Sequence, residues 1–163
     1  MSSPDRDGRH DFDFLFGRWR VANRRLGSPL TPGSTDWVQF SSTVQTEPVL
    51  AGLGNVDRYR SPEFPGRPGW EALALRLFDP DTRTWRIWWA STAAAGELDT
   101  PVTGCFAGDH GVFGCDDVLV GRPLKMRYEW SEVNSPEPRW QQAFSFDGGR
   151  SWQPNWVMVW RRD

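Results

Sequence analysis

The chain has 163 residues with 19 basic and 21 acidic side chains, a net charge of −2 and 38% hydrophobic residues. This composition is typical of one soluble globular domain that is long enough to bury a core. The charges are interspersed, which argues against a nucleic-acid partner, and no apolar run approaches the roughly 20 residues that span a bilayer.

The N-terminal segment is polar and lacks the apolar stretch of a secretory signal peptide, so we expect a cytoplasmic protein. We expect residues 1–9 to be disordered. The aromatic segment Asp11–Gly17 is too short for a free helix. It predicts one helical turn that plugs an end of the domain, with Asp13 as its cap.

Short alternating segments separated by turn residues fill the remaining chain, and they hold most of the 11 tryptophans. The predicted strands are, in chain order, Arg18–Leu26, Trp37–Thr46, Asn55–Arg60, Glu71–Phe78, Trp85–Ser91, Val102–Ala107, Val112–Cys115, Pro123–Ser131, Arg139–Phe146 and Asn155–Arg161. Short strands at regular spacing, without a long helical pattern, predict an all-β fold. Mostly short turns favour an antiparallel up-and-down barrel of about 8–10 strands. We expect a single domain over residues 1–163.

The first and last predicted strands carry a matching pair of motifs. Gly17-Arg18-Trp19 opens the first strand, and Arg161-Arg162 closes the last. This pattern resembles the calycins, the group of lipocalins and fatty-acid-binding proteins, in which a Gly-x-Trp at the start of the barrel packs against an arginine from the final strand. The resemblance implies that Arg162 packs against Trp19.

Three longer segments extend this resemblance. They are the opening His10–Trp19, the central hairpin Leu75–Pro80 with Trp85–Trp89, and the closing segment Ser145–Trp152 with Asn155-Trp156. Together they resemble an uncharacterised bacterial family of lipocalin-like (calycin) β-barrels, a domain of unknown function. The resemblance covers about residues 10 to 162; it implies a barrel and carries no established function. The closing segment also matches the Asp-box pattern, which we interpret as a hairpin turn held by Asp147.

The central hairpin brings an arginine among aromatic side chains. If Phe78 pairs with Trp85, one face of the hairpin carries Arg76 with Trp85 and Trp89 diagonal to it. On a lumen-facing surface, Arg76 would gain cation–π attraction and could anchor a carboxylate, phenolate or enolate. The alternative is an outward arginine lying on a tryptophan shelf, and a register slip of one residue would reverse the assignment.

A second wall follows from the strand Pro123–Ser131. Tyr128 and Trp130 share its apolar face and should point inward, and Gln142 is the polar exception on the matching face of the next strand. Tyr128 and Gln142 could orient a ligand carbonyl, or they could bond each other and close the core. Asp57 on the third predicted strand is a candidate luminal acid.

Several classes of site are argued against by the residues. Cys105 and Cys115 flank a predicted turn at Gly108–Gly111 and are expected to be free thiols in a reducing compartment. The chain has no zinc pattern, nucleophile elbow, phosphate loop or dinucleotide fingerprint, and no histidine after His110 that could ligate heme. We therefore expect no metal and no cofactor.

These features predict a barrel that binds a small hydrophobic or aromatic molecule with an anionic or carbonyl group. The candidate ligand-binding residues are Arg76, Trp85, Trp89, Tyr128, Trp130, Gln142 and Asp57. Two alternatives stay open: a cofactor-independent cyclase or isomerase of secondary metabolism that acts on a polyketide-like substrate in the same lumen, and a structural module filled by its own tryptophans. No catalytic residue is assigned, and a homodimer through exposed strands also stays open.

Overall fold

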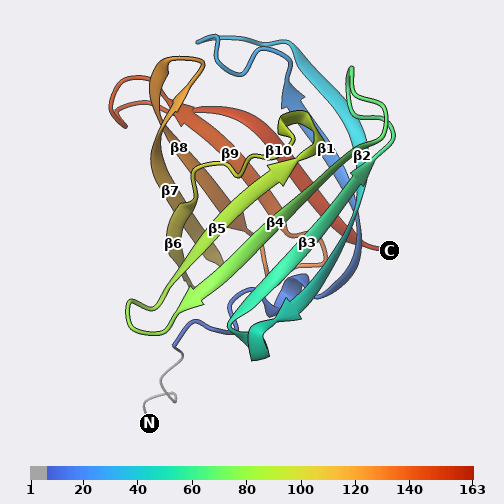
Figure 1. Ribbon diagram of the computed structural model, residues 1–163, viewed down its shortest axis with the longest axis vertical. Coiled ribbons are helices and arrows are strands. Elements are labelled where there is room, and N and C mark those ends of the chain that lie inside the picture. Colours follow the sequence, from blue (N-terminus) through green and yellow to red (C-terminus); the bar gives the residue numbers. More distant parts are fainter. Residues whose placement is uncertain (1–6) are drawn as a thin grey trace.

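The computed structural model describes residues 7–163, which form a closed antiparallel barrel of ten strands with three short 3₁₀ helices (Figure 1). The strands are β1 (Gly17–Leu26), β2 (Trp37–Val49), β3 (Gly54–Ser61), β4 (Trp70–Asp79), β5 (Thr84–Ser91), β6 (Val102–Ala107), β7 (His110–Leu119), β8 (Arg122–Ser131), β9 (Arg139–Ser145) and β10 (Gln153–Arg162). The 3₁₀ helices are η1 (Asp13–Leu15), η2 (Leu50–Gly52) and η3 (Thr92–Ala94). Each strand pairs with its neighbours in sequence, and β1 pairs with β10. The predicted up-and-down barrel is confirmed.

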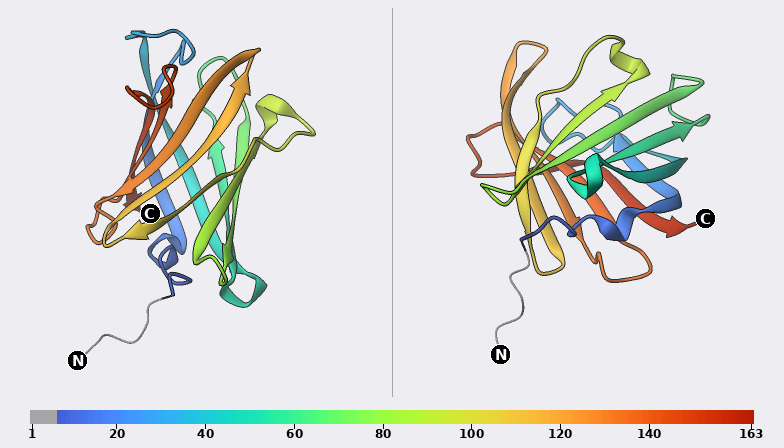
Figure 2. Two further views of the ribbon diagram at one scale, coloured as in Figure 1. Left: turned by 90° about the vertical axis from the view of Figure 1, so that its left-hand side faces the viewer. Right: turned by 60° about the horizontal axis from the view of Figure 1, so that its bottom comes forward.

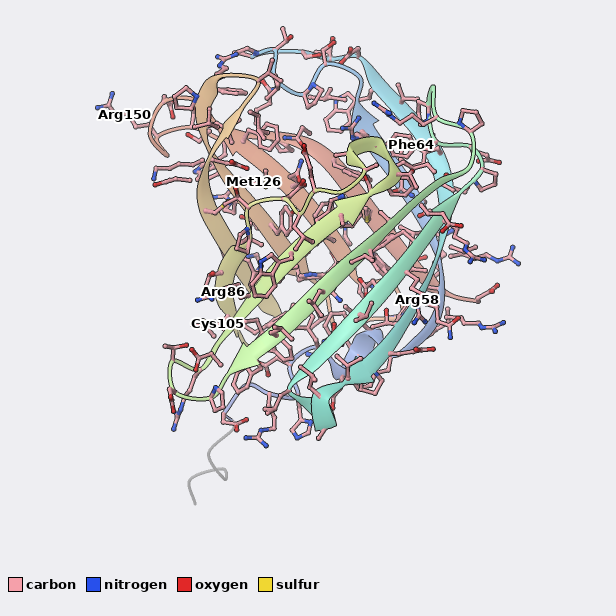
Figure 3. All side chains as sticks on the ribbon, viewed as in Figure 1. Arg58, Phe64, Arg86, Cys105, Met126 and Arg150 are labelled. Carbon is pink, nitrogen blue, oxygen red and sulfur yellow. The ribbon has the colours of Figure 1, made fainter. Side chains whose placement is uncertain are left out.

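Alternation along the strands decides which side chains fill the barrel. In β4 every second residue from Trp70 to Phe78 is buried, and the residues between them are exposed or half-buried. Phe78 lies opposite Trp85 and Arg76 lies opposite Ile87, which is the predicted register of the central hairpin. Because a barrel turns one face of each strand inward, this register places Arg76 in the lumen. Charged side chains such as Arg150 extend outward from the ribbon (Figure 3).

The segment before β1 closes one end of the barrel (Figure 2). Phe12 and Leu15 have no exposed surface, and the Phe12 ring lies 5.0 Å from the Trp85 ring, centroid to centroid. The Trp85 indole donates a hydrogen bond of 2.9 Å to the backbone oxygen of Gly8. Residues 7–9 are therefore placed against the barrel; residues 1–6, for which we also expect disorder, lie outside the described part of the chain.

The predicted capping role of Asp13 is wrong. Phe12 occupies the N-cap position of η1 and makes no side-chain cap bond, and Asp13 lies inside the helix. The Asp13 carboxylate instead accepts from Nδ1 of His10 at 2.9 Å. The physical reason is burial. The Phe12 ring enters the lumen and positions the turn, so that the helix begins after Phe12 and Asp13 lies within it.

The motifs of the first and last strands meet as the resemblance implies. The Arg162 guanidinium lies 3.8 Å from the centre of the Trp19 ring, and it donates to the backbone oxygens of Phe14 and Phe16. Gly17 has φ +110°, and a Cβ there would lie 2.9 Å from Nη1 of Arg162. Glycine at this position therefore lets the arginine reach the plug.

The strand limits differ from the prediction most at β7, which runs from His110 to Leu119 instead of stopping at Cys115. His110 pairs with Ala107 and does not lie in the turn. Strands β6 and β8 hydrogen-bond to β7 on both sides, and this pairing overrides the weak strand propensity of its glycines and aspartates. Cys105 lies opposite Val112, so it does not face Cys115, and both thiols are free.

Candidate functional site

An ion pair lies in the middle of the lumen, between Asp57 on β3 and Arg76 on β4. Their side chains are 0% and 3% exposed, and Nη2 of Arg76 lies 2.5 Å from Oδ2 of Asp57. Nη1 of Arg76 donates to the other carboxylate oxygen at 2.7 Å and to Oδ1 of Asn55 at 2.8 Å. This bidentate geometry is the strong form of a charge-assisted hydrogen bond.

Other polar groups bond the Asp57 carboxylate. Thr46 and Tyr59 donate their hydroxyls to the Asp57 carboxylate, each at 2.8 Å. Burial, followed by the charge of Asp57, raises the pKa of Tyr59, so its hydroxyl stays a donor. The Arg76 guanidinium lies 4.8 Å from the centre of the Phe12 ring. Phe12 is therefore its aromatic partner instead of the predicted tryptophans, because the plug inserts between them.

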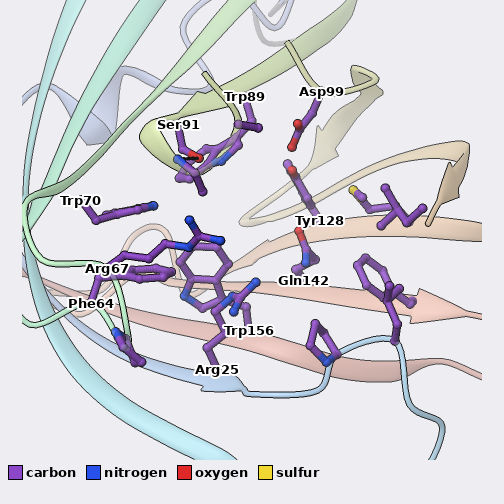
Figure 4. Close-up of a pocket in the computed structure, with 18 of the residues that line it drawn as sticks. Arg25, Phe64, Arg67, Trp70, Trp89, Ser91, Asp99, Tyr128, Gln142 and Trp156 are labelled. Carbon is purple, nitrogen blue, oxygen red and sulfur yellow. Dashed lines mark hydrogen bonds between the residues drawn. The ribbon is translucent and has the colours of Figure 1, made fainter. Parts of the chain in front are cut away.

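A cavity of about 440 Å³ lies at the opposite end of the barrel, where the loops β1–β2, β3–β4, β5–β6 and β7–β8 surround the lumen (Figure 4). Its lining includes Arg25, Phe64, Arg67, Trp70, Trp89, Asp99, Tyr128, Trp140, Gln142 and Trp156. The volume falls within the roughly 300–1,000 Å³ that is usual for small-molecule sites. The plugged end and the cavity are separated by the Asp57–Arg76 layer, whose Tyr59 ring lies 5.0 Å from Trp89.

Aromatic rings form most of the cavity wall. Phe64 and Trp70 stack at 4.4 Å with an interplanar angle of 16°. Trp156 stands nearly perpendicular to both Trp89 and Trp140, at centroid distances of 5.9 Å. These stacked and edge-to-face contacts hold the rings in place, and an aromatic wall of this kind suits an apolar molecule.

Two arginines lie together on one side of the cavity (Figure 4). Arg25 at the end of β1 sits over the rings of Phe64 and Trp156, at 5.7 Å and 5.2 Å from their centres. Burial, with the nearby charge of Arg67, lowers the pKa of Arg25. Within residues 7–163, neither Arg25 nor Arg67 forms an ion pair with a carboxylate. This side of the cavity therefore carries positive charge that no carboxylate of residues 7–163 neutralises in an ion pair.

Polar groups line the facing side (Figure 4). The side chain of Tyr128 is 8% exposed, and its hydroxyl makes no hydrogen bond with any other described residue. Gln142 lies directly opposite Tyr128 on β9, but its amide donates to Oδ1 of Asn155 at 2.7 Å. The alternative in which Tyr128 and Gln142 bond each other is therefore not what the structure has, and the Tyr128 hydroxyl stays available.

The structure divides the seven candidate residues among the cavity, the central layer and the plugged end of the barrel. Trp89, Tyr128 and Gln142 line the cavity. Asp57 and Arg76 form the central pair, while Trp85 and Trp130 pack around Phe12 at the plugged end, at 5.0 Å and 6.4 Å.

Sequence reasoning missed the residues that give the cavity its charge. Arg25 has a signal, because it lies at the same parity as the buried Trp19, Val21 and Asn23 of β1. Arg67 has none, because it lies in the proline-rich β3–β4 loop, where no periodicity predicts a direction.

The described residues lack two further kinds of feature. Among the described residues, no three histidine, cysteine or acidic side chains are grouped so that they could hold a metal ion. Residues 7–163 likewise contain no helix with the length and apolarity to cross a membrane.

Comparisons with known proteins give little beyond the fold. No protein-family model matches the chain, and no curated protein matches it. Among solved structures it is similar to a protein of unknown function from the DUF3598 family of Nostoc punctiforme, with 9% identity and a TM-score of 0.25 over 100% of both chains. A likeness at this level carries no functional argument, so the barrel assignment rests on the strand pairing described above.

Proposed function

We propose that this protein binds a small aromatic molecule with an anionic group in the cavity at the open end of the barrel. The observation that carries the proposal is the pair Arg25 and Arg67, two guanidinium groups beside an aromatic wall that have no acidic partner in the described part of the chain. A carboxylate, sulfonate or phosphate between them would offset their mutual repulsion, and planar guanidinium groups bind such anions well.

The anionic anchor of this proposal differs from the arginine that the sequence indicates. Both terminal nitrogens of Arg76 bond Asp57, and Nη1 also bonds Asn55, so reaching this guanidinium would require breaking a buried pair. Arg25 and Arg67 instead line the cavity itself. The aromatic rings of Trp70, Trp89 and Trp156 would hold the apolar body of the ligand.

We also propose that the barrel is calycin-like, which the contact between Arg162 and Trp19 supports. A cytoplasmic protein that carries or senses a small aromatic metabolite would need a cavity of this kind.

A cyclase or isomerase that acts in the same cavity is a second candidate function. The observation that favours it is the Tyr128 hydroxyl, which has no partner among the described residues and could polarise a carbonyl.

A matched pair of fluorescent probes tests the charge requirement. The probes are 1-anilinonaphthalene-8-sulfonate and N-phenyl-1-naphthylamine, which share one aromatic skeleton and differ by the sulfonate. We expect the double variant R25M/R67M to raise the Kd of the sulfonate probe by about 10-fold or more, because the loss of a charge-assisted hydrogen bond usually weakens binding by at least this factor. The Kd of the neutral probe should change by less than about 3-fold.

The control variant is R24M/R86M. Arg24 and Arg86 lie over tryptophan rings, at 5.0 Å and 5.9 Å from the centres of Trp37 and Trp88, but they are exposed and face outward. This variant should leave both Kd values unchanged. The proposal would be contradicted if the Kd values of both probes rose equally in R25M/R67M, or if the Kd of the sulfonate probe rose in the control variant.

A further inference from the structure

The Tyr128 hydroxyl faces the cavity and forms no hydrogen bond with another of the residues 7–163. Its ring packs against Trp140 at 5.0 Å, and the side chain points from β8 into the cavity (Figure 4). A hydroxyl that faces a cavity without a protein partner can donate a hydrogen bond to a group that enters the cavity.

Asp99 lies beside this hydroxyl on the loop between η3 and β6. The backbone N–H of Asp99 donates to the backbone oxygen of Trp89 at 2.9 Å, which ties the loop to the cavity wall. The Asp99 carboxyl lies on the Tyr128 side of the cavity, across from the arginines (Figure 4). Burial and the charges of Asp117 and Glu97 raise the pKa of Asp99, and the charge of Asp99 contributes, after burial, to the raised pKa of Tyr128.

We propose that Tyr128 and Asp99 form a second polar subsite, which takes a hydroxyl group of the ligand at the end remote from its anionic group. A hydroxyl oxygen can accept from Tyr128 while its own proton is donated to the Asp99 carboxylate. An ether or carbonyl oxygen accepts from Tyr128 equally well, but it turns lone pairs toward the carboxylate. The inference rests on the proposed function and narrows the ligand to a hydroxyaryl anion.

The arrangement of charges supports this orientation. Arg25 and Arg67 are on one side of the cavity, Asp99 is on the other, and the rings of Trp89 and Trp156 lie between them. An anion placed next to Asp99 would be repelled, whereas one placed between the arginines is attracted. The ligand therefore has one favourable direction, with its hydroxyl at the Tyr128 end.

Naphthoates test the subsite, with Kd measured by isothermal titration calorimetry. The probes are 2-naphthoate, its 5-, 6- and 7-hydroxy derivatives and 6-methoxy-2-naphthoate. At least one hydroxynaphthoate should bind the wild-type protein about 10-fold more tightly than 2-naphthoate, a difference of about 1.4 kcal/mol. The methoxy compound should gain nothing, because it cannot donate to Asp99.

The variants Y128F and D99N should each reduce the hydroxyl advantage, the ratio of the Kd of 2-naphthoate to that of its best hydroxy derivative, to less than about 3-fold. D109N is the matched control, since Asp109 is an exposed acid in the β6–β7 turn at the other end of the barrel. Near-UV circular dichroism of each variant reports whether the aromatic packing is intact.

Two failures are distinguishable. If 2-naphthoate binds and R25M/R67M weakens it, but no hydroxy derivative binds more tightly, or the advantage survives in Y128F and D99N, the subsite is wrong and the proposed function stands. If 2-naphthoate does not bind, or binds equally well to R25M/R67M, the proposed function is wrong and the subsite falls with it.

Discussion

The central ion pair gives a prediction whose size follows from the structure. In D57N, the Arg76 guanidinium keeps its buried position and its hydrogen bond to Asn55, but it loses its counter-charge. Removing one partner of a buried pair costs about 3–5 kcal/mol of unfolding free energy. For a domain of this length, Tm should fall by about 6–20 °C, at about 2–4 °C per kcal/mol.

The partner variant should cost less. In R76M, the Asp57 carboxylate still accepts the hydroxyls of Thr46 and Tyr59, so more of its bonding remains than Arg76 keeps in D57N. In the double variant D57N/R76M no buried charge is left, and we expect its cost to fall below the sum of the single costs by about 1–3 kcal/mol.

Urea unfolding at pH 7, followed by tryptophan fluorescence and far-UV circular dichroism, measures all four unfolding free energies. The two probes should report coincident transitions before a two-state fit is used. A loss below about 1 kcal/mol in D57N, or single costs that add within about 0.5 kcal/mol in the double variant, would refute the reasoning that the pair is buried and mutually dependent.

Three further predictions follow from other parts of the barrel. F12A should lower the unfolding free energy, measured by urea unfolding, by about 3–5 kcal/mol, because a fully buried ring is lost. It should leave the Kd of the fluorescent probes at the distant cavity unchanged, and a raised Kd would mean that the two ends of the barrel are coupled. At pH 8, a disulfide reagent should label exposed Cys105 quickly and Cys115 slowly, because burial raises the pKa of Cys115 to about 11; equal rates would contradict this. Hydrogen bonds led by Ser151 lower the pKa of Asp147 from 3.8 to about 2, so its stabilising contribution is present above pH 4 and is lost as the pH falls through about 2. The Tm values of wild type and D147A should therefore differ at pH 7 and converge near pH 2, and a constant difference would argue against the Asp147 hydrogen bonds.

The sequence by itself determined the fold class and most of the facing of the strands. Alternation of polar and apolar residues is a local signal, and turn residues such as Asp79-Pro80 mark where each strand ends, so the number, order and pairing of the strands follow from short segments. The register of Phe78 with Trp85 and the inward direction of Tyr128 were predictable for the same reason, whereas the direction of Arg76 stayed open between the lumen and the outer face.

Only the tertiary structure decided which luminal residues meet. Asp57 and Arg76 lie on adjacent strands, but the Asp57 carboxylate also accepts from Thr46 and Tyr59, and the ring that covers Arg76 comes from Phe12 before β1. Alternation says that a side chain points inward and says nothing about its height along the barrel axis, which the registers of several strands set together. The grouping of Arg25 with Arg67 arises because the end of β1 and a proline-rich loop meet at the same rim, a contact between segments far apart in the chain.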